Sequence, residues 1–448
     1  MASTSIHNGQ GSGEFRPQSN VPPAAHDHGR IEPGEIAVGV VIGRASEYFD
    51  FFVYALASVL VFPAIFFPFE PKLEGTLYAF VIFAFAFLAR PFGTVIFMAI
   101  QRAYGREVKL TLALFLLGFS TAGIALLPTF DHIGVWAIVL LSLLRVGQGI
   151  ALGGAWDGLP SLLALNAPQN KRGWYAALAQ LGAPTGFIVA ASLFAYMLAN
   201  LTTEDFLEWG WRYPFYVAFA INVVALFSRL RMVSTPEYAR QLDERELEPA
   251  GVVELSRTQG RNIIIGALAA LASYALFHLV TVFPLSWIKL YSLREMADFL
   301  VVQIIGGVIM ALGIVASGMI ADRFGRRTTL GAMALLIAIL SAFVPTLMNG
   351  GESGQNTFIL IGFALLGLSY GQAAGAVTAN FQRRYRYTGA ALTQDLAWLV
   401  GAGFAPLVAL GLSANFGMAY VSFYLLSGAV GSLAALSLNR ALESKEED

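Results

Sequence analysis

Long apolar stretches alternate with short polar turns along almost the whole chain. A helix needs about 20 apolar residues to cross the hydrocarbon core of a bilayer, and glycine, proline and charged residues mark the breaks between stretches of this length. The pattern predicts an all-α membrane protein with twelve membrane-spanning helices. We expect them near residues 36–66, 76–101, 109–128, 135–165, 174–199 and 212–232, and near 262–290, 298–321, 328–348, 357–380, 387–412 and 418–440.

A polar segment at residues 233–260 divides these helices into two groups of six. We expect two pseudo-symmetric bundles, at 34–232 and 261–440, joined by a cytoplasmic linker with an amphipathic helix near 236–247.

Both ends of the chain differ from the apolar body. Residues 1–33 are rich in Gly, Ser, Pro, His and Asn without periodicity, which predicts a disordered cytoplasmic tail. Residues 441–448 are expected to form a short cytoplasmic tail. The N-terminal tail lacks the features of a removable signal peptide, so the first span is expected to remain in the protein.

Composition narrows the class of protein. Of 448 residues, 56% are hydrophobic and 13% are charged, whereas soluble proteins have about 45–50% apolar and about 25% charged residues. The formal net charge of −1 gives no general attraction to nucleic acid. The chain has no cysteine, and no nucleophile–base set, metal-binding cluster or cofactor motif is evident. The sequence therefore predicts a membrane protein that is not an enzyme and needs no metal or cofactor.

Basic residues are unevenly shared between the loops on the two sides of the expected bundle. One side carries those of the linker and Arg102, Arg106, Lys109, Lys171, Arg172, Arg323, Arg326, Arg327, Arg383, Arg384 and Arg386. The other side has little beyond Lys72, Lys289 and Arg294. Because cytoplasmic loops are enriched in Lys and Arg, we expect the rich side, and both termini, in the cytoplasm.

Two charged turns occupy matching places in the two halves. The turn at 318–327 reads GMIADRFGRR and its first-half counterpart at 98–107 reads MAIQRAYGRE. Both lie between long apolar stretches, which indicates an internal repeat. Duplicated bundles of this kind are typical of secondary transporters.

The first span holds ionisable residues, which are costly within a bilayer and therefore require an explanation. Arg44, Glu47, Asp50 and Tyr54 share one helical face, which we expect to point into the bundle. Glu47 is the first candidate for a proton carrier and Asp50 the second, because burial favours the protonated form of a carboxyl group. The alternative is an Arg44–Glu47 pair that only holds helices together.

The fourth span carries Arg145 and, on the same face, Gln148. A buried arginine can hold a substrate carboxylate through two parallel hydrogen bonds. The alternative is an interhelical pair with Glu47 or Asp50. Asp157 lies further along, on another face of the same helix. Glycine is also frequent in this span, which favours close helix packing.

Polar and aromatic residues in the second half are further candidates. Tyr274 and His278 share a face of the seventh span and could contact substrate, although a buried, hydrogen-bonded histidine is the commoner case. In the eleventh span, Asp395 is a third proton-carrier candidate, and Gln394 and Trp398 could line a cavity. Trp398 could equally be a core residue.

The turn at 318–327 resembles the signature of the major facilitator superfamily, G-x-x-x-D-R-x-G-R-R/K. Four further motifs resemble those of one family of this superfamily, the metabolite:proton symporters. They are IGRASEYFDFFVY at 42–54, RPFG at 90–93, RVGQGIALGG at 145–154 and RYTGA at 386–390. Members of that family are symporters of the bacterial inner membrane, with permeases for organic acids such as α-ketoglutarate, citrate and shikimate, and for proline and betaine.

The resemblance implies alternating access between two rocking halves of a monomer in the lipid bilayer, with a small metabolite and a proton as the transported partners. It implies a gating role for the residues of the signature turns and the second span, namely Arg90, Arg106, Asp322, Arg323, Gly325, Arg326 and Arg327. Arg44 and Arg145 favour an organic acid as substrate. Asp157, Asp395 and Trp398 could instead hold an amine by charge and cation–π contact, as in a betaine or proline symporter.

The chain departs from the family pattern at the first-half turn. Arg102 and Ala103 replace the usual acid–arginine pair, and Glu107 stands where a basic residue is usual. The contact that this turn normally makes must be weakened, rebuilt with swapped charges or lost. Elsewhere, Ala155 replaces a glutamate of the fourth span and Ala379 an acidic residue after the tenth.

The altered turn also supports a third possibility, a membrane sensor that binds a ligand without transporting it.

Overall fold

The structure, a computed structural model, describes residues 33–155, 163, 167–168, 171–233, 248–378 and 381–438. The expected N-terminal tail up to residue 32, the amphipathic helix at 236–247 and the C-terminal tail lie outside the described residues, as do Asp157 and Ala379.

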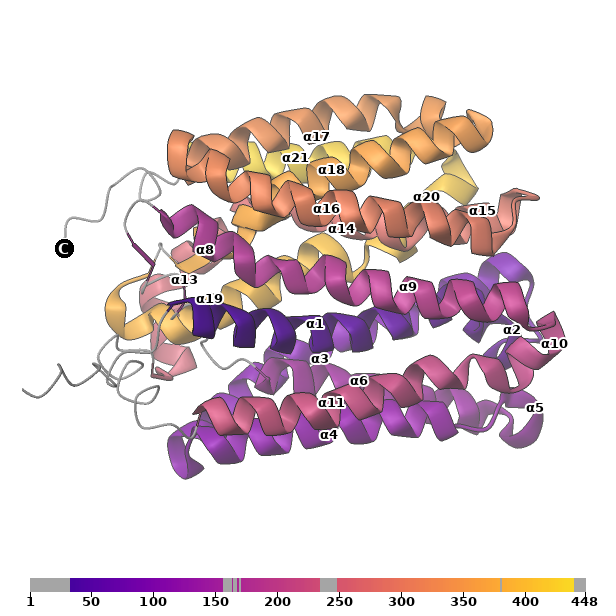
Figure 1. Cartoon of the computed structure of the whole chain (residues 1–448), viewed down its shortest axis with the longest axis horizontal. Coiled ribbons are helices and arrows are strands. Elements are labelled where there is room, and N and C mark those ends of the chain that lie inside the picture. The colour runs from indigo at the N-terminus through magenta and orange to yellow at the C-terminus, as the bar shows by residue number, and fades with distance from the viewer. Residues whose placement is uncertain are drawn as a thin grey trace, which may run out of the picture.

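The first half folds into six long helical segments. They are α1 (Pro33–Leu60), α3 (Lys72–Tyr104), α4 (Arg106–Leu126), α6 (Val135–Gly154), α8 (Arg172–Leu178) with its continuation α9 (Gly182–Asn200), and α11 (Arg212–Val233). Short helices α2 (Phe62–Phe66), α5 (Phe130–Ile133) and α10 (Thr203–Asp205) gather at one end of the bundle (Figure 1).

The second half repeats this arrangement. Its segments are α13 (Val252–Ala269) with α14 (Leu271–Thr281) and α15 (Phe283–Tyr291), α16 (Met296–Phe324), α17 (Arg326–Met348), α18 (Gly351–Thr378), α19 (Arg386–Ala397) with α20 (Ala405–Phe416), and α21 (Ala419–Leu438).

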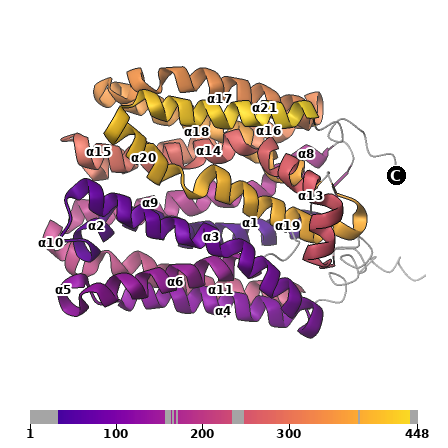
Figure 2. The same ribbon diagram turned by 180° about the vertical axis from the view of Figure 1, so that it is seen from behind.

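The chain forms two pseudo-symmetric six-helix bundles. Ten of the described helical segments are long and apolar enough to cross a membrane. The long helices α1 and α11, which carry more polar residues, complete a set of twelve long segments. The bundles meet where α9 and α8 pack against α16 and where α3 packs against α19 and α20. The first contact is seen in Figure 1 and the second from behind in Figure 2. The fold predicted from the apolar pattern is confirmed.

The two charged turns have the same backbone conformation. Gly105 joins α3 to α4 with a φ of 89°, and Gly325 joins α16 to α17 with a φ of 85°. Only glycine adopts such positive φ values without steric cost. The turns occupy corresponding positions in the two halves, as the internal repeat predicts.

Several spans are interrupted where an unbroken helix was expected. The first ends at Leu60 before the separate α2, and α6 ends at Gly154 rather than near residue 165. The seventh is divided at Ala270 and Val282.

The fifth and eleventh spans are interrupted at corresponding places. A 3₁₀ turn at Ala179–Leu181 precedes α9, and a π-helical turn at Trp398–Gly403 precedes α20. Proline follows each break closely, at Pro184 and Pro406, and removes a backbone donor that a regular helix would use. The two prolines therefore accompany a break at the corresponding place in each helix.

Glycine allows α6 to lie directly against α3. A Cβ atom on Gly149 would lie 2.3 Å from the Ala86 carbonyl oxygen, and one on Gly153 would lie 2.3 Å from that of Arg90. Neither gap admits a methyl group unless a backbone moves. This close approach brings α3, and Arg90 with it, to the interface between the halves.

We predict that Gly149→Ala destabilises the protein, because overpacking of a helix contact costs about 1–3 kcal/mol. Its melting temperature in detergent, followed by size-exclusion chromatography of heated samples, should fall by several degrees. Gly331→Ala in α17 is the matched control, since a Cβ there would meet its nearest side-chain atom at 3.9 Å. Equal melting temperatures for the two variants would contradict the packing argument.

Candidate functional site

A cavity lined by both charged and aromatic residues lies between the two halves. It is lined by Arg44, Glu47, Tyr48, Phe51, Ala86, Phe87, Arg90, Leu152, Gln394 and Trp398. These residues come from α1, α3, α6, α19 and the π-helical turn after α19. Of the residues predicted to contact substrate, Arg44, Gln394 and Trp398 line this cavity.

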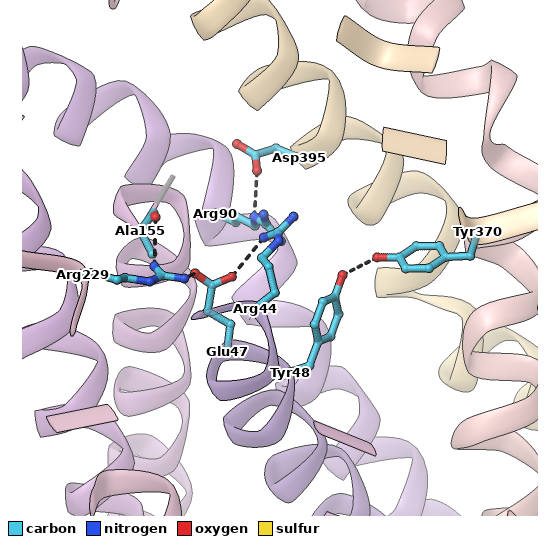
Figure 3. Close-up of polar contacts among 8 residues, drawn as sticks. All are labelled: Arg44, Glu47, Tyr48, Arg90, Ala155, Arg229, Tyr370 and Asp395. Carbon is cyan, nitrogen blue, oxygen red and sulfur yellow. Dashed lines mark hydrogen bonds and ion pairs between the residues drawn. The ribbon is translucent and has the colours of Figure 1, made fainter. Parts of the chain in front are cut away.

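Glu47 is held between two arginines at one wall of the cavity (Figure 3). Arg44 Nη1 donates to Glu47 Oε2 at 2.9 Å, and Arg229 Nη2 of α11 donates to Glu47 Oε1 at 2.6 Å. Arg44 and Arg229 are 7% and 5% exposed. The predicted Arg44–Glu47 pair is therefore present, but it has a second cation. Arg229 was missed by the sequence analysis, although an arginine inside the sixth span was a visible signal.

Arg44 keeps unused hydrogen-bonding capacity. Its Nη2 and Nε atoms are buried without a hydrogen-bond partner among the described residues, and the same holds for Trp398 Nε1. Buried donors are almost always satisfied in proteins. Both side chains line the cavity, so a ligand bound there could accept hydrogen bonds from these N–H groups.

A second ion pair links the two halves beside the cavity. Arg90 Nε of α3 lies 2.7 Å from Asp395 Oδ1 of α19, and Thr94 Oγ1 donates to Asp395 Oδ2 at 2.5 Å. Asp395 is 3% exposed. The structure thus brings a predicted gating residue together with a predicted proton carrier, and the contact crosses the interface between the two halves.

Asp50 belongs to a separate network inside the first half. Its Oδ1 accepts hydrogen bonds from Thr121 Oγ1 (2.5 Å) and Asn222 Nδ2 (3.3 Å), and its Oδ2 accepts one from Gln148 Nε2 (3.4 Å). Gln148 Oε1 in turn accepts from Arg145 Nη1 at 2.9 Å. The network connects α1, α4, α6 and α11.

Arg145 is enclosed by protein. Its guanidinium lies 3.8 Å from the centre of the Tyr54 ring, and Nε donates to the Phe83 carbonyl oxygen at 3.3 Å. Arg145, Gln148, Asp50 and Tyr54 therefore lie together inside the first half, and they are not among the residues that line the cavity. In this conformation Arg145 faces Asp50 through Gln148, which is close to the alternative of an interhelical pair.

Tyr274 and His278 form a layer behind the cavity wall. Tyr274 packs edge-on against Trp398 with ring centres 5.0 Å apart, and His278 stacks on Phe51 at 5.4 Å. His278 Nδ1 is hydrogen-bonded to Thr281 Oγ1 at 3.2 Å. In front of this layer, the hydroxyl groups of Tyr48 in α1 and Tyr370 in α18 are hydrogen-bonded across the halves (Figure 3).

The second-half signature turn closes against the first half. Asp322 accepts hydrogen bonds from the backbone N–H groups of Gly173 (2.6 Å) and Trp174 (3.1 Å) at the start of α8. A carboxylate is stabilised at a helix N-terminus by free N–H groups and the helix dipole. Arg326 Nε donates to Gln372 Oε1 at 3.4 Å, and Gln372 Nε2 donates to the Gly173 carbonyl oxygen at 3.3 Å.

The other arginines of this turn also contact their own half. Arg327 Nε donates to the Leu436 carbonyl oxygen at 2.8 Å, and the Arg323 guanidinium lies over the Phe324 ring.

The first-half turn makes its contacts with different chemistry. Arg102, which stands where Asp322 does, donates through Nη1 to the Ala250 carbonyl oxygen at 3.2 Å. Next to it, Gln101 Oε1 accepts from Lys109 Nζ and from Tyr387 Oη, both at 3.0 Å. Tyr387 lies at the start of α19. The first-half contact with the opposite half is therefore rebuilt with an amide, a lysine and a phenol in place of a carboxylate.

The opposite end of the bundle has a contact of its own. Lys289 Nζ in α15 donates to the carbonyl oxygens of Val59 (2.7 Å) and Leu60 (2.9 Å) at the end of α1. Cations are favoured at helix C-termini, where carbonyl groups lack helical partners. The two halves are thus bonded to each other on both sides of the cavity.

Two pseudo-symmetric bundles with a cavity between them are typical of a membrane transporter. Residues 51–394 match the model of the Major Facilitator Superfamily. The chain belongs to this superfamily, a family of transporters rather than enzymes.

Named relatives agree with this assignment. An inner membrane metabolite transport protein of Escherichia coli is 35% identical over 90% of this chain and 93% of its own length. The shikimate transporter of Escherichia coli is 34% identical over 89% of this chain and 93% of its own length. The crystal structure of a D-xylose–proton symporter has the same fold, with a TM-score of 0.69 at 19% identity, covering 91% of this chain and 97% of that protein.

We predict that the Arg90–Asp395 pair couples the two halves. Arg90→Ala and Asp395→Ala should each lower the melting temperature in detergent, because each leaves a buried charge without its partner. The double variant should melt close to the less stable of the two single variants. The effects of mutating two residues in contact on the free energy of unfolding are not additive.

Arg384→Ala is the control for this cycle, because the Arg384–Glu254 pair is exposed and such pairs contribute little. Additive losses from Arg90→Ala and Asp395→Ala, or a control as damaging as either, would show that the pair does not link the halves.

Proposed function

We propose that the protein is a proton-coupled symporter of a small organic acid that works by alternating access. The observation that carries the proposal is the unused guanidinium face of Arg44 inside the interfacial cavity, next to an ion-paired carboxylate. A guanidinium with free N–H groups is the group best suited to bind a carboxylate.

The charges around the cavity support an anionic substrate. Three guanidinium groups and two carboxylates meet there, those of Arg44, Arg90, Arg229, Glu47 and Asp395. The guanidinium groups outnumber the carboxylates in this set, and a surplus of one sign of charge attracts the opposite sign. A substrate carboxylate on Arg44 would meet that surplus.

Glu47 is the proton carrier in this mechanism. A substrate carboxylate on Arg44 would lie beside Glu47, and a nearby like charge favours the protonated form of a carboxyl group. Anion binding therefore favours proton binding to Glu47. The protein with both substrate anion and proton bound has the same net charge as the empty protein. The Asp50–Gln148–Arg145 network would hold α1 in register with α4, α6 and α11.

The contacts on either side of the cavity would act as the gates. Asp322, the Arg102 and Gln101 contacts and the Arg90–Asp395 pair lie towards the arginine-rich end, and Lys289 lies at the other. We infer from the positive-inside rule that the arginine-rich end is cytoplasmic. Breaking one set while keeping the other would expose the cavity to one side of the membrane at a time.

A zwitterion such as betaine or proline is the second candidate. Aromatic faces attract quaternary ammonium groups, and Tyr48, Phe51, Phe87 and Trp398 all line the cavity. Against it, the carboxylate among the lining residues, that of Glu47, is engaged with Arg44 and Arg229, and the nearby Asp395 is engaged with Arg90.

The direct test is uptake by proteoliposomes with and without an inward proton gradient. The panel contains shikimate, α-ketoglutarate, citrate, proline and betaine. Gradient-driven accumulation of an acid, abolished by a protonophore, is the expected result. Accumulation of betaine or proline instead would favour the second candidate, and ligand binding without any accumulation would indicate a sensor.

We predict that Glu47→Gln retains substrate exchange across the membrane but loses uphill uptake, because glutamine cannot bind and release a proton. Counterflow in proteoliposomes measures the exchange, and gradient-driven uptake measures the coupling. Asp50→Asn is the comparison variant, since Asp50 lies outside the cavity lining. Full uphill uptake by Glu47→Gln would move the proton site to another residue.

A further inference from the structure

Three aromatic rings form a continuous apolar wall of the cavity. Phe51 of α1 lies 5.7 Å from Phe87 of α3, and Trp398 of the second half lies 5.9 Å and 6.0 Å from these two, measured between ring centres. The wall is therefore contributed by both halves, and a ligand lying on it would contact both at once.

A second layer of rings fixes this wall in place. Tyr274 and Phe277 each lie 5.0 Å from Trp398, and His278 stacks behind Phe51. Side chains packed on this side restrict the rings, so the wall presents a rigid apolar face to the cavity. A rigid surface favours a rigid ligand, because little conformational freedom is lost on either side.

The polar end of the cavity suits one carboxylate. Arg44 offers Nη2 and Nε, and Trp398 offers its indole N–H, each without a partner among the residues described. Arg90 and Arg229 are already paired with Asp395 and Glu47. A second or third carboxylate on the ligand would have to displace one of these buried pairs.

We propose, building on the proposed transport of an organic acid, that the substrate is a monocarboxylate with a compact ring. The carboxylate binds Arg44, and one face of the ring lies on Phe51, Phe87 and Trp398. Because the wall belongs to both halves, the ring determines specificity and also draws the halves together around the substrate.

The inference that the substrate has a ring can be tested by calorimetry, which measures the affinity of the purified full-length protein in detergent for a set of acids. Shikimate and gluconate form the critical pair, since both are hydroxylated monocarboxylates and only shikimate is cyclic. We expect shikimate or 4-hydroxybenzoate to bind at least about tenfold more tightly than gluconate, since one aromatic contact contributes about 0.5–1.5 kcal/mol and several are available. Citrate, α-ketoglutarate and betaine should bind more weakly than the cyclic acids.

Two tryptophan variants test the wall. Trp398→Leu should reduce the preference for the cyclic acid over gluconate to about threefold or less, since one aromatic contact is lost. Trp287→Leu is the control, because Trp287 packs on Tyr291 outside the cavity lining, and it should leave the preference unchanged.

The outcomes separate this inference from the proposed function. Tighter binding of citrate, α-ketoglutarate or gluconate, with proton-driven uptake of that acid, would contradict the inference that the substrate has a ring. It would leave the proposed transport of an organic acid unaffected. An unchanged preference in Trp398→Leu would do the same. Binding of betaine alone, or of none of these compounds, would overturn both.

Discussion

Glu47 lies between two arginines in the interior of a membrane protein, and this pairing joins α1 to α11 beside the cavity. Water is absent from the bilayer core, so each buried charge needs a partner within the protein. Arg44 on α1 and Arg229 on α11 supply those partners. Buried ion pairs gain little stability over apolar packing, so their presence in the cavity wall is better explained by what they bind and release.

The same constraint shapes the interface between the halves. Polar contacts across it include Arg90 with Asp395, Tyr48 with Tyr370, Asp322 with the start of α8 and Lys289 with the end of α1. Two of these use helix ends, where backbone groups are free to bond. In the proposed mechanism such contacts are exchanged for others as the halves rock, whereas the apolar packing within each bundle stays intact.

The sequence predicted the number and order of the helices because membrane-length apolar runs and basic turns are local signals. It also placed Arg44, Glu47, Asp50, Arg145 and Gln148 on inward faces. Sequence alone did not identify their partners, since Arg229, Thr121 and Asn222 are distant along the chain and only packing brings them close. For the same reason it left open whether the altered first-half turn was lost or rebuilt, and the Gln101–Tyr387 contact appears only in the folded bundle.

The central claim is that substrate anion and proton are coupled because the anion binds Arg44 beside Glu47. Calorimetry of the transported acid, in buffers with different ionisation enthalpies near neutral pH, measures how many protons are taken up on binding. The account predicts uptake of about one proton per bound anion by the unaltered protein and none by Glu47→Gln. Binding without proton uptake, or equal uptake by both proteins, would contradict it.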